Sequence, residues 1–87
     1  MDEFVIVVFP DSRDVVIDGN EEAGKTNTLI VVNTGRHTFS LQGEQNFTPR
    51  EQTVLVKNTR ANDPLTVEFH KLPAVADDGG TENQPRG

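Results

Sequence analysis

The apolar residues of this chain fall into short stretches of Val, Ile, Phe and Thr, which turn residues interrupt every eight to twelve positions. No stretch repeats its apolar residues at the helical spacing of three and four, so the pattern predicts an all-β fold. Strands that are each apolar on one face bury those faces when two sheets stack. We therefore predict a small antiparallel two-sheet β-sandwich. About six strands are expected, over residues 4–9, 15–17, 28–32, 36–41, 52–56 and 65–70.

The length of 87 residues allows one domain, because a chain of this size buries only about 60–65% of the surface that it exposes when unfolded. Val, Ile, Leu and Phe make up 24 of the 87 residues, which exceeds the share of roughly 20% below which charged chains stay disordered. Residues 1–72 are assigned to the sandwich. Residues 73–87 are rich in Gly, Pro and acidic side chains, which predicts a disordered acidic tail.

Acidic residues outnumber basic ones by 14 to 8, which gives a formal net charge of −6. This charge repels phosphate backbones and anionic lipid, so we expect neither nucleic acid nor direct membrane insertion. The longest apolar run, residues 4–9, is too short for a secretory signal or a membrane span. As written, the chain is expected to be cytoplasmic. If it is excised from a longer protein, an envelope or periplasmic location is expected.

Several short motifs follow one another in a recognisable order. Pro10 ends the first apolar stretch, and Val-Val-Ile-Asp-Gly (15–19), Gly-Lys-Thr (24–26) and Gly-Arg-His (35–37) come after it. Over roughly residues 4–72 the chain thus resembles the PEGA domain, a small β-sandwich of bacterial and archaeal surface, envelope and signalling proteins. The Pro-Gly-Ala turn that names the family is replaced here by Asp-Ser-Arg-Asp (11–14). The resemblance implies a transthyretin-like sandwich, a role in interaction or surface assembly, and no catalytic residues.

Residues 19–26 also match the phosphate-loop pattern G-x-x-x-x-G-K-[ST]. That chemistry needs a helix after the loop, whose first N–H groups hold the phosphates. Here a β-branched stretch follows, and Glu21 and Glu22 would face the bound anion. We therefore interpret the segment as a glycine-supported loop between two strands, with no nucleotide cofactor. The structural turn residues are Asp18, Gly19, Gly24, Lys25, Thr26, Gly35 and His37.

Catalytic and metal chemistry find little support in the sequence. No Ser, His and Asp arrangement resembles a triad, and there is no Cys, so no enzyme, cofactor or metal is predicted. Acidic residues between positions 11 and 22 could attract calcium, but their spacing departs from an EF-hand loop. The weak candidates for metal ligands are Asp14, Asp18 and Glu22.

The first apolar stretch has large side chains on both of its faces. A chain this small and polar cannot easily cover both faces, so one side is expected to dock on something. The leading hypothesis is a non-catalytic protein-interaction module, an accessory or structural subunit of a larger protein assembly or a self-associating one. The alternative is a ligand-binding module of an envelope or surface protein, which takes calcium, a basic peptide or a glycan. The predicted interaction residues are Phe4, Val5, Val7, Phe9, Gly35, Arg36 and Phe47.

Overall fold

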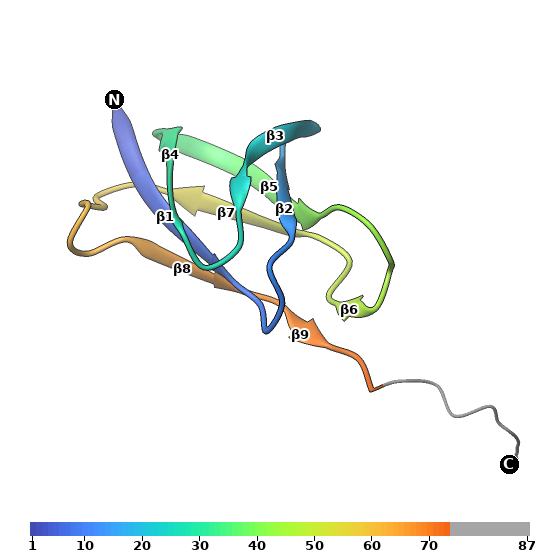
Figure 1. The fold of residues 1–87 in the computed structure, drawn as a ribbon. Coiled ribbons are helices and arrows are strands. Elements are labelled where there is room, and N and C mark those ends of the chain that lie inside the picture. Colours follow the sequence, from blue (N-terminus) through green and yellow to red (C-terminus); the bar gives the residue numbers. More distant parts are fainter. Residues whose placement is uncertain (74–87) are drawn as a thin grey trace, which may run out of the picture.

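The computed structural model describes residues 1–73, which form β-strands and no helix (Figure 1). The predicted tail, residues 73–87, lies outside the described residues except for Pro73. The strands are β1 (Asp2–Val8), β2 (Asp14–Ile17), β3 (Asn20–Lys25), β4 (Leu29–Asn33), β5 (Gly35–Leu41), β6 (Phe47–Thr48), β7 (Gln52–Val56), β8 (Leu65–Glu68) and β9 (His70–Lys71).

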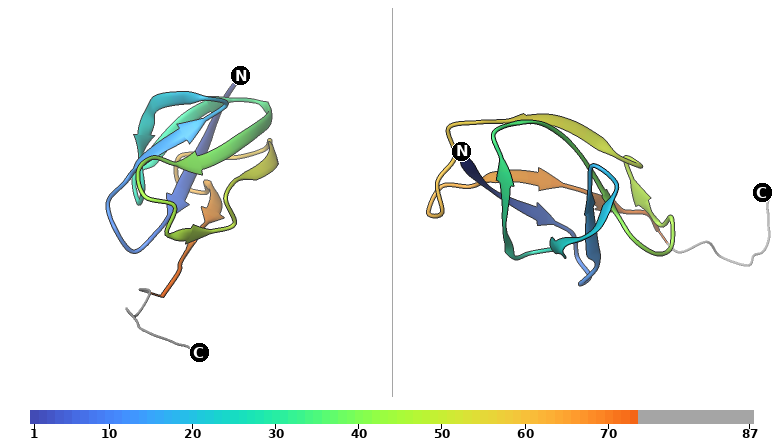
Figure 2. Two further views of the ribbon diagram at one scale, coloured as in Figure 1. Left: turned by 90° about the vertical axis from the view of Figure 1, so that its right-hand side faces the viewer. Right: turned by 90° about the horizontal axis from the view of Figure 1, so that it is seen from above.

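Two sheets pack face to face as a sandwich-like body (Figure 2). Sheet A has the order β4-β1-β8, and sheet B has the order β3-β2-β5-β7. The short strands β6 and β9 form a third, two-stranded sheet next to the end of β8. The all-β sandwich predicted from the sequence pattern is confirmed.

The core lies between the two sheets and follows the alternation of side chains along each strand. In β1, Val5 and Val7 are buried, whereas Phe4, Ile6 and Val8 point the other way and are only half-buried. Strands of both sheets supply the remaining core residues, which are Phe9, Val15, Ile17, Ile30, Phe39, Leu41, Phe47, Val56, Val67 and Phe69.

One strand pair differs from the antiparallel arrangement that was expected. β8 pairs with β1 in parallel, with Val5 opposite Leu65 and Val8 opposite Glu68. The connection from β7 to β8 crosses from sheet B to sheet A at the end of the sandwich where β1 begins (Figure 1). β8 therefore starts beside the start of β1 and runs in the same direction.

Strand β3 occupies the segment that was interpreted as a loop. It pairs with β2, and Ile17 faces Asn20 across the two-residue turn Asp18-Gly19. Both turn residues have positive φ, 52° and 82°, as tight turns between twisted antiparallel strands require. Five of the six residues of β3 are polar or glycine, so its apolar pattern is too weak to indicate a strand.

Candidate functional site

Four of the predicted interaction residues lie in the core. Val5 and Val7 are completely buried, and Phe9 and Phe47 are each 2% exposed. The prediction was wrong for these four residues. Alternation along β1 separates two sets of side chains, and the set that contains Val5, Val7 and Phe9 points toward sheet B.

Phe47 is held by aromatic packing at one end of the core. Its ring meets Phe9 and Phe69 edge to face, with centroids 6.1 and 5.6 Å away, which is a favourable geometry for aromatic pairs. The Arg13 guanidinium carbon lies 5.6 Å from the centroids of Phe9 and Phe47, and its Nε donates to the carbonyl oxygen of Gln42 over 2.8 Å. The cluster closes the sandwich and presents no exposed aromatic ring to a sugar.

The other three predicted interaction residues do not form one surface. Phe4 is half-buried on the outer side of sheet A. Gly35 and Arg36 begin β5 in sheet B, and the Arg36 side chain is exposed on that sheet. The expected surface, which combined the first strand with the Gly35 turn, is therefore split between two layers.

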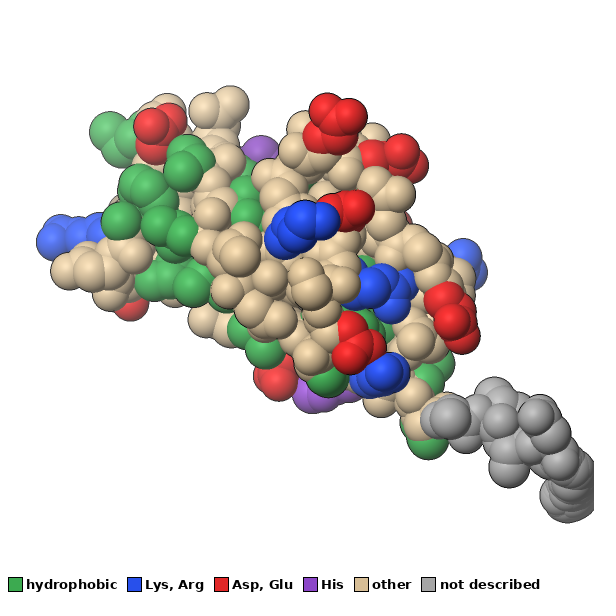
Figure 3. All heavy atoms as spheres, viewed as in Figure 1, with side chains coloured by type: hydrophobic (Ala, Val, Ile, Leu, Met, Phe, Trp, Pro, Cys, Tyr) green, Lys and Arg blue, Asp and Glu red, His purple; other side chains and the backbone are tan. Residues whose placement is uncertain are grey.

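An apolar surface lies on the outer side of sheet A. The register of β1 and β4 puts Phe4 opposite Val31 and Ile6 opposite Leu29, so these four side chains and Val8 share one face. Leu29 and Val31 are 45% and 54% exposed. Figure 3 shows hydrophobic side chains gathered over β1 and β4. We call these five residues the outer apolar face.

The outer side of sheet B is different, because polar side chains cover much of it. Thr38 of β5 lies opposite Thr53 of β7, and their hydroxyl oxygens are 2.9 Å apart. Leu55 is the large hydrophobic residue that is most exposed there, at 47%. The outer side of sheet A is thus apolar, whereas the outer side of sheet B is largely polar.

Carboxylates lie at two ends of the outer apolar face. Asp2 begins β1 and follows the same alternation as Phe4, and Glu68 of β8 lies opposite Val8. Both side chains are exposed. A partner that covers this face therefore meets an apolar centre with a carboxylate at each of these two ends, and Figure 3 shows a Lys or Arg side chain beside the same cluster.

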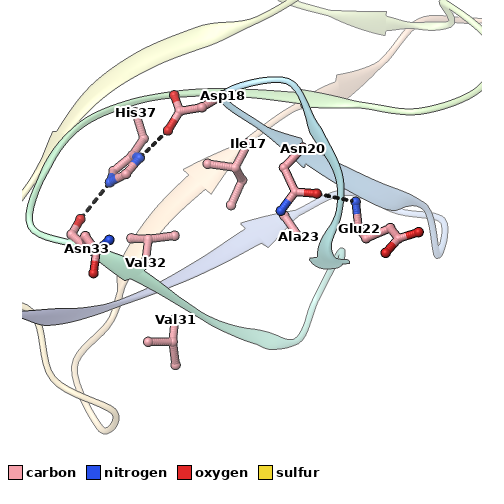
Figure 4. Close-up of a pocket in the computed structure, with 9 residues that line it drawn as sticks. All are labelled: Ile17, Asp18, Asn20, Glu22, Ala23, Val31, Val32, Asn33 and His37. Carbon is pink, nitrogen blue, oxygen red and sulfur yellow. Dashed lines mark hydrogen bonds and ion pairs between the residues drawn. The ribbon is translucent and has the colours of Figure 1, made fainter.

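A hollow of about 380 Å³ opens between β4 of sheet A and β3 of sheet B (Figure 4). Ile17, Ala23, Val31 and Val32 form its apolar part. Its polar lining consists of Asp18, Asn20, Glu22, Asn33 and His37.

His37 joins the two sheets at one end of this hollow. Its Nδ1 lies 2.5 Å from Asp18 Oδ2, and its Nε2 lies 2.6 Å from the carbonyl oxygen of Asn33 (Figure 4). Both partners are acceptors, so both ring nitrogens donate only when the imidazole is protonated. The hydrogen bond to Asp18 accordingly raises the pKa of His37 above its ordinary value of 6.5, although burial opposes the shift. Two hydrogen bonds lower the pKa of Asp18. The one from the backbone N–H of Thr38 has the larger effect, and the one from His37 has the smaller.

The turn residues taken from the phosphate-loop and PEGA patterns have structural contacts. Gly24 lies in β3 with a φ of 155°, and a Cβ there would come within 2.8 Å of Ile30 Cγ1. Lys25 Nζ forms an ion pair with Asp14 over 2.7 Å. Thr26 is 3% exposed, and its hydroxyl donates to the carbonyl oxygen of Asp11. The segment is a strand followed by an anchored turn, and the interpretation of all of it as a loop was wrong.

The weak candidates for metal ligands are not brought together. Asp14 pairs with Lys25 and Asp18 with His37, while Glu22 lies on β3 at the hollow. Among residues 1–73, no three His, Asp or Glu side chains are grouped closely enough to hold a metal ion.

Glu3 is a buried carboxylate that the sequence analysis missed. It is 3% exposed and accepts hydrogen bonds from the Thr34 hydroxyl, the Thr59 N–H (2.9 Å) and the Thr59 hydroxyl (2.6 Å). These hydrogen bonds, with Thr34 contributing most, lower its pKa from 4.5 to about 2. Its place two residues before the inward Val5 is the signal that could have revealed it. Glu3 ties two connections of the sandwich to β1.

No protein-family model, curated protein or solved structure matches the chain. The PEGA resemblance therefore remains a prediction. In the part of the chain that the structure describes, no helix has the length and apolar character needed to cross a membrane.

Proposed function

We propose that this chain is a non-catalytic protein-interaction module, which docks as a small accessory subunit on a larger protein through the outer apolar face. The observation that supports this most is the exposure of Leu29 and Val31, 45% and 54%, beside the half-buried Phe4, Ile6 and Val8. Contiguous exposed apolar patches are typical of interaction sites. The core of the sandwich is complete without these side chains.

The charges around the face favour a partner of different sequence over a second copy. Asp2 and Glu68 lie at two ends of the face, and the chain carries a net charge of −6. A second copy would bring a like-charged surface to this one, and juxtaposed like charges disfavour association. We therefore expect a protein surface with an apolar centre and Lys or Arg at its rim.

The test compares two lysine substitutions of similar exposure. Val31→Lys changes the outer apolar face, and Leu55→Lys changes sheet B at a residue that is 47% exposed. Wild type and both variants, checked by circular dichroism, are used to capture partners from extracts of the source cells. We expect one stoichiometric partner with wild type and Leu55→Lys, crosslinks to β1 and β4, and loss of that partner with Val31→Lys.

Two results would overturn the proposal. One is a chain that elutes alone, and the other is a partner that Val31→Lys retains. Light scattering on the purified chain adds a separate measurement, because a dimer that Val31→Lys dissociates would contradict the partner of different sequence.

Among the alternative ligands, a basic peptide is the one that a described feature favours. Phe47 is buried, so it cannot stack on a sugar, and Asp14 and Asp18 are already paired with Lys25 and His37. The hollow between β3 and β4 has acidic side chains and an apolar part, which suits a basic side chain with a long apolar stem.

A further inference from the structure

Strand β4 has one open side. β4 is an edge strand of sheet A and pairs only with β1 among the described strands. Thr34 N donates to the carbonyl oxygen of Met1, so the alternation of an antiparallel ladder turns the backbone groups of Ile30 and Val32 toward β1. The N–H and C=O groups of Leu29 and Val31 then point to the open side, where an added strand can pair with them.

The hollow lies along this open side. β4 forms one wall and β3, an edge strand of sheet B, forms the other (Figure 4). A chain that pairs with β4 would therefore project alternate side chains toward the hollow. Its volume of about 380 Å³ lies within the usual range for small binding pockets.

The lining of the hollow selects the kind of side chain. Ala23 and Val32 can contact an apolar stem. Glu22 lies at the rim, with its carboxylate turned away from these two residues (Figure 4), and the described residues provide no ion-pair partner for it. Asp18 adds negative charge but already binds His37. Lys and Arg combine an apolar stem with a cationic head, so the lining favours a basic residue over an acidic or a small neutral one.

We propose that an extended segment of a partner protein pairs with the open edge of β4 and places the apolar stem of a Lys or Arg side chain in the hollow, with the charged head at the rim near Glu22. This site uses the backbone edge of β4 and the hollow, whereas the outer apolar face uses side chains of β1 and β4, and Val31 borders both. The β4 site rests on the proposed function and adds that the partner's segment carries a basic residue. Binding at the β4 site does not require that the outer apolar face binds anything.

A pair of synthetic peptides tests the proposal. Both are seven-residue, acetylated and amidated Thr-Val repeats, with Lys at the centre of one and norleucine at the centre of the other. Each is titrated into the full ¹⁵N-labelled chain while backbone amide shifts are followed. We expect the Lys peptide to shift amides of residues 20–23 and 29–33, and to bind several-fold more tightly than the norleucine peptide.

Two carboxylate variants provide the matched comparison. Glu22→Gln removes the charge at the hollow, and Glu21→Gln removes the neighbouring charge on β3, outside the hollow. Exposed ion pairs at the stronger end of their range correspond to about a 2- to 5-fold change in affinity. We expect Glu22→Gln to weaken binding of the Lys peptide within this range and Glu21→Gln to leave it within twofold.

Leu29→Pro tests the backbone part, because Leu29 does not line the hollow, and proline there removes an N–H that points to the open side and is tolerated at the first residue of an edge strand. Loss of peptide binding with a retained fold supports pairing at β4. Val8→Ser separates this site from the outer apolar face, since it alters that face away from the edge and should leave peptide binding intact. Three results overturn the proposal: no shifts in β3 and β4 at millimolar peptide, equal affinity for both peptides, or no effect of Glu22→Gln.

Discussion

At the residue scale, Glu3 shows how one buried carboxylate can connect separate segments. It binds Thr34, which follows β4, and Thr59, which lies between β7 and β8. The two connections and β1 thus share a single acceptor group. Because hydrogen bonds to a charged group stabilise that charge, the carboxylate is bound more strongly when it is ionised.

The first prediction concerns the acid limb of stability. The folded-state pKa of Glu3 is lowered from 4.5 to about 2, so its ionised form stabilises the fold fully above pH 4.5. This contribution is lost as the pH falls from 4.5 toward 2. Glu3→Gln should lower the urea midpoint at pH 7 and flatten its fall over this pH interval.

Glu68→Gln is the control for this measurement, because Glu68 is an exposed carboxylate of the same sheet. It should leave the urea midpoint close to that of wild type at both ends of the interval. An unchanged midpoint in Glu3→Gln at pH 7 would contradict the role assigned to the buried carboxylate.

The second prediction concerns His37, whose folded-state pKa is raised above 6.5 by the Asp18 carboxylate. The folded state therefore holds the proton more tightly than the unfolded chain. The resulting stabilisation is present below pH 6.5 and is lost as the pH rises through the folded-state pKa. Urea unfolding between pH 5.5 and 9 should show this decline, and His37→Gln should reduce it.

Asp18→Asn provides the partner test, with the proton followed by NMR on the His37 ring. Removal of the carboxylate should move the His37 pKa back toward 6.5. A pKa that stays raised in Asp18→Asn would show that another group holds the proton.

At the scale of elements, the strands with strong apolar alternation were predictable and the polar ones were not. Residues 36–41 alternate clearly, and they form most of β5. β3 has little apolar content, and its pairing depends on the Asp18-Gly19 turn and on the space that Gly24 leaves for Ile30. A pattern of apolar and polar residues does not reveal such backbone requirements.

The third prediction tests the contact between β3 and β4. Gly24→Ala would put a Cβ 2.8 Å from Ile30 Cγ1 at a positive φ. Overpacking and backbone strain of this kind cost about 1–3 kcal/mol. We expect the free energy of unfolding, measured with urea, to fall by that amount.

A double-mutant cycle distinguishes the steric clash from the strain. Ile30→Ala removes the atoms that the new methyl group meets, so Gly24→Ala should cost less in that background than in wild type. If the cost is the same in both backgrounds, the contact with Ile30 does not explain it.

At the scale of the whole molecule, the sandwich has one apolar face more than its core needs. The sequence correctly indicated that the first apolar stretch has two apolar faces, and it predicted that one of them would dock. It named Val5, Val7 and Phe9, which are buried, instead of Ile6 and Val8. Alternation separates the faces of a strand, but only the position of sheet B decides which face becomes the core.

The last prediction separates stability from docking through this difference between the faces. Phe39 is completely buried between the sheets, and Phe39→Ala should lower the free energy of unfolding by about 3–5 kcal/mol because it leaves a cavity. Val31→Thr keeps the β-branched shape on an edge strand and should change the free energy of unfolding by no more than about 0.5 kcal/mol.

If the outer apolar face serves binding and not folding, Val31→Thr should nevertheless weaken partner capture, and Leu55→Thr, on sheet B, should not. Urea unfolding and quantitative capture on the same preparations check both parts. A large loss of stability in Val31→Thr would mean that the exposed valine supports the fold. That result would contradict the role of the outer apolar face as a docking surface.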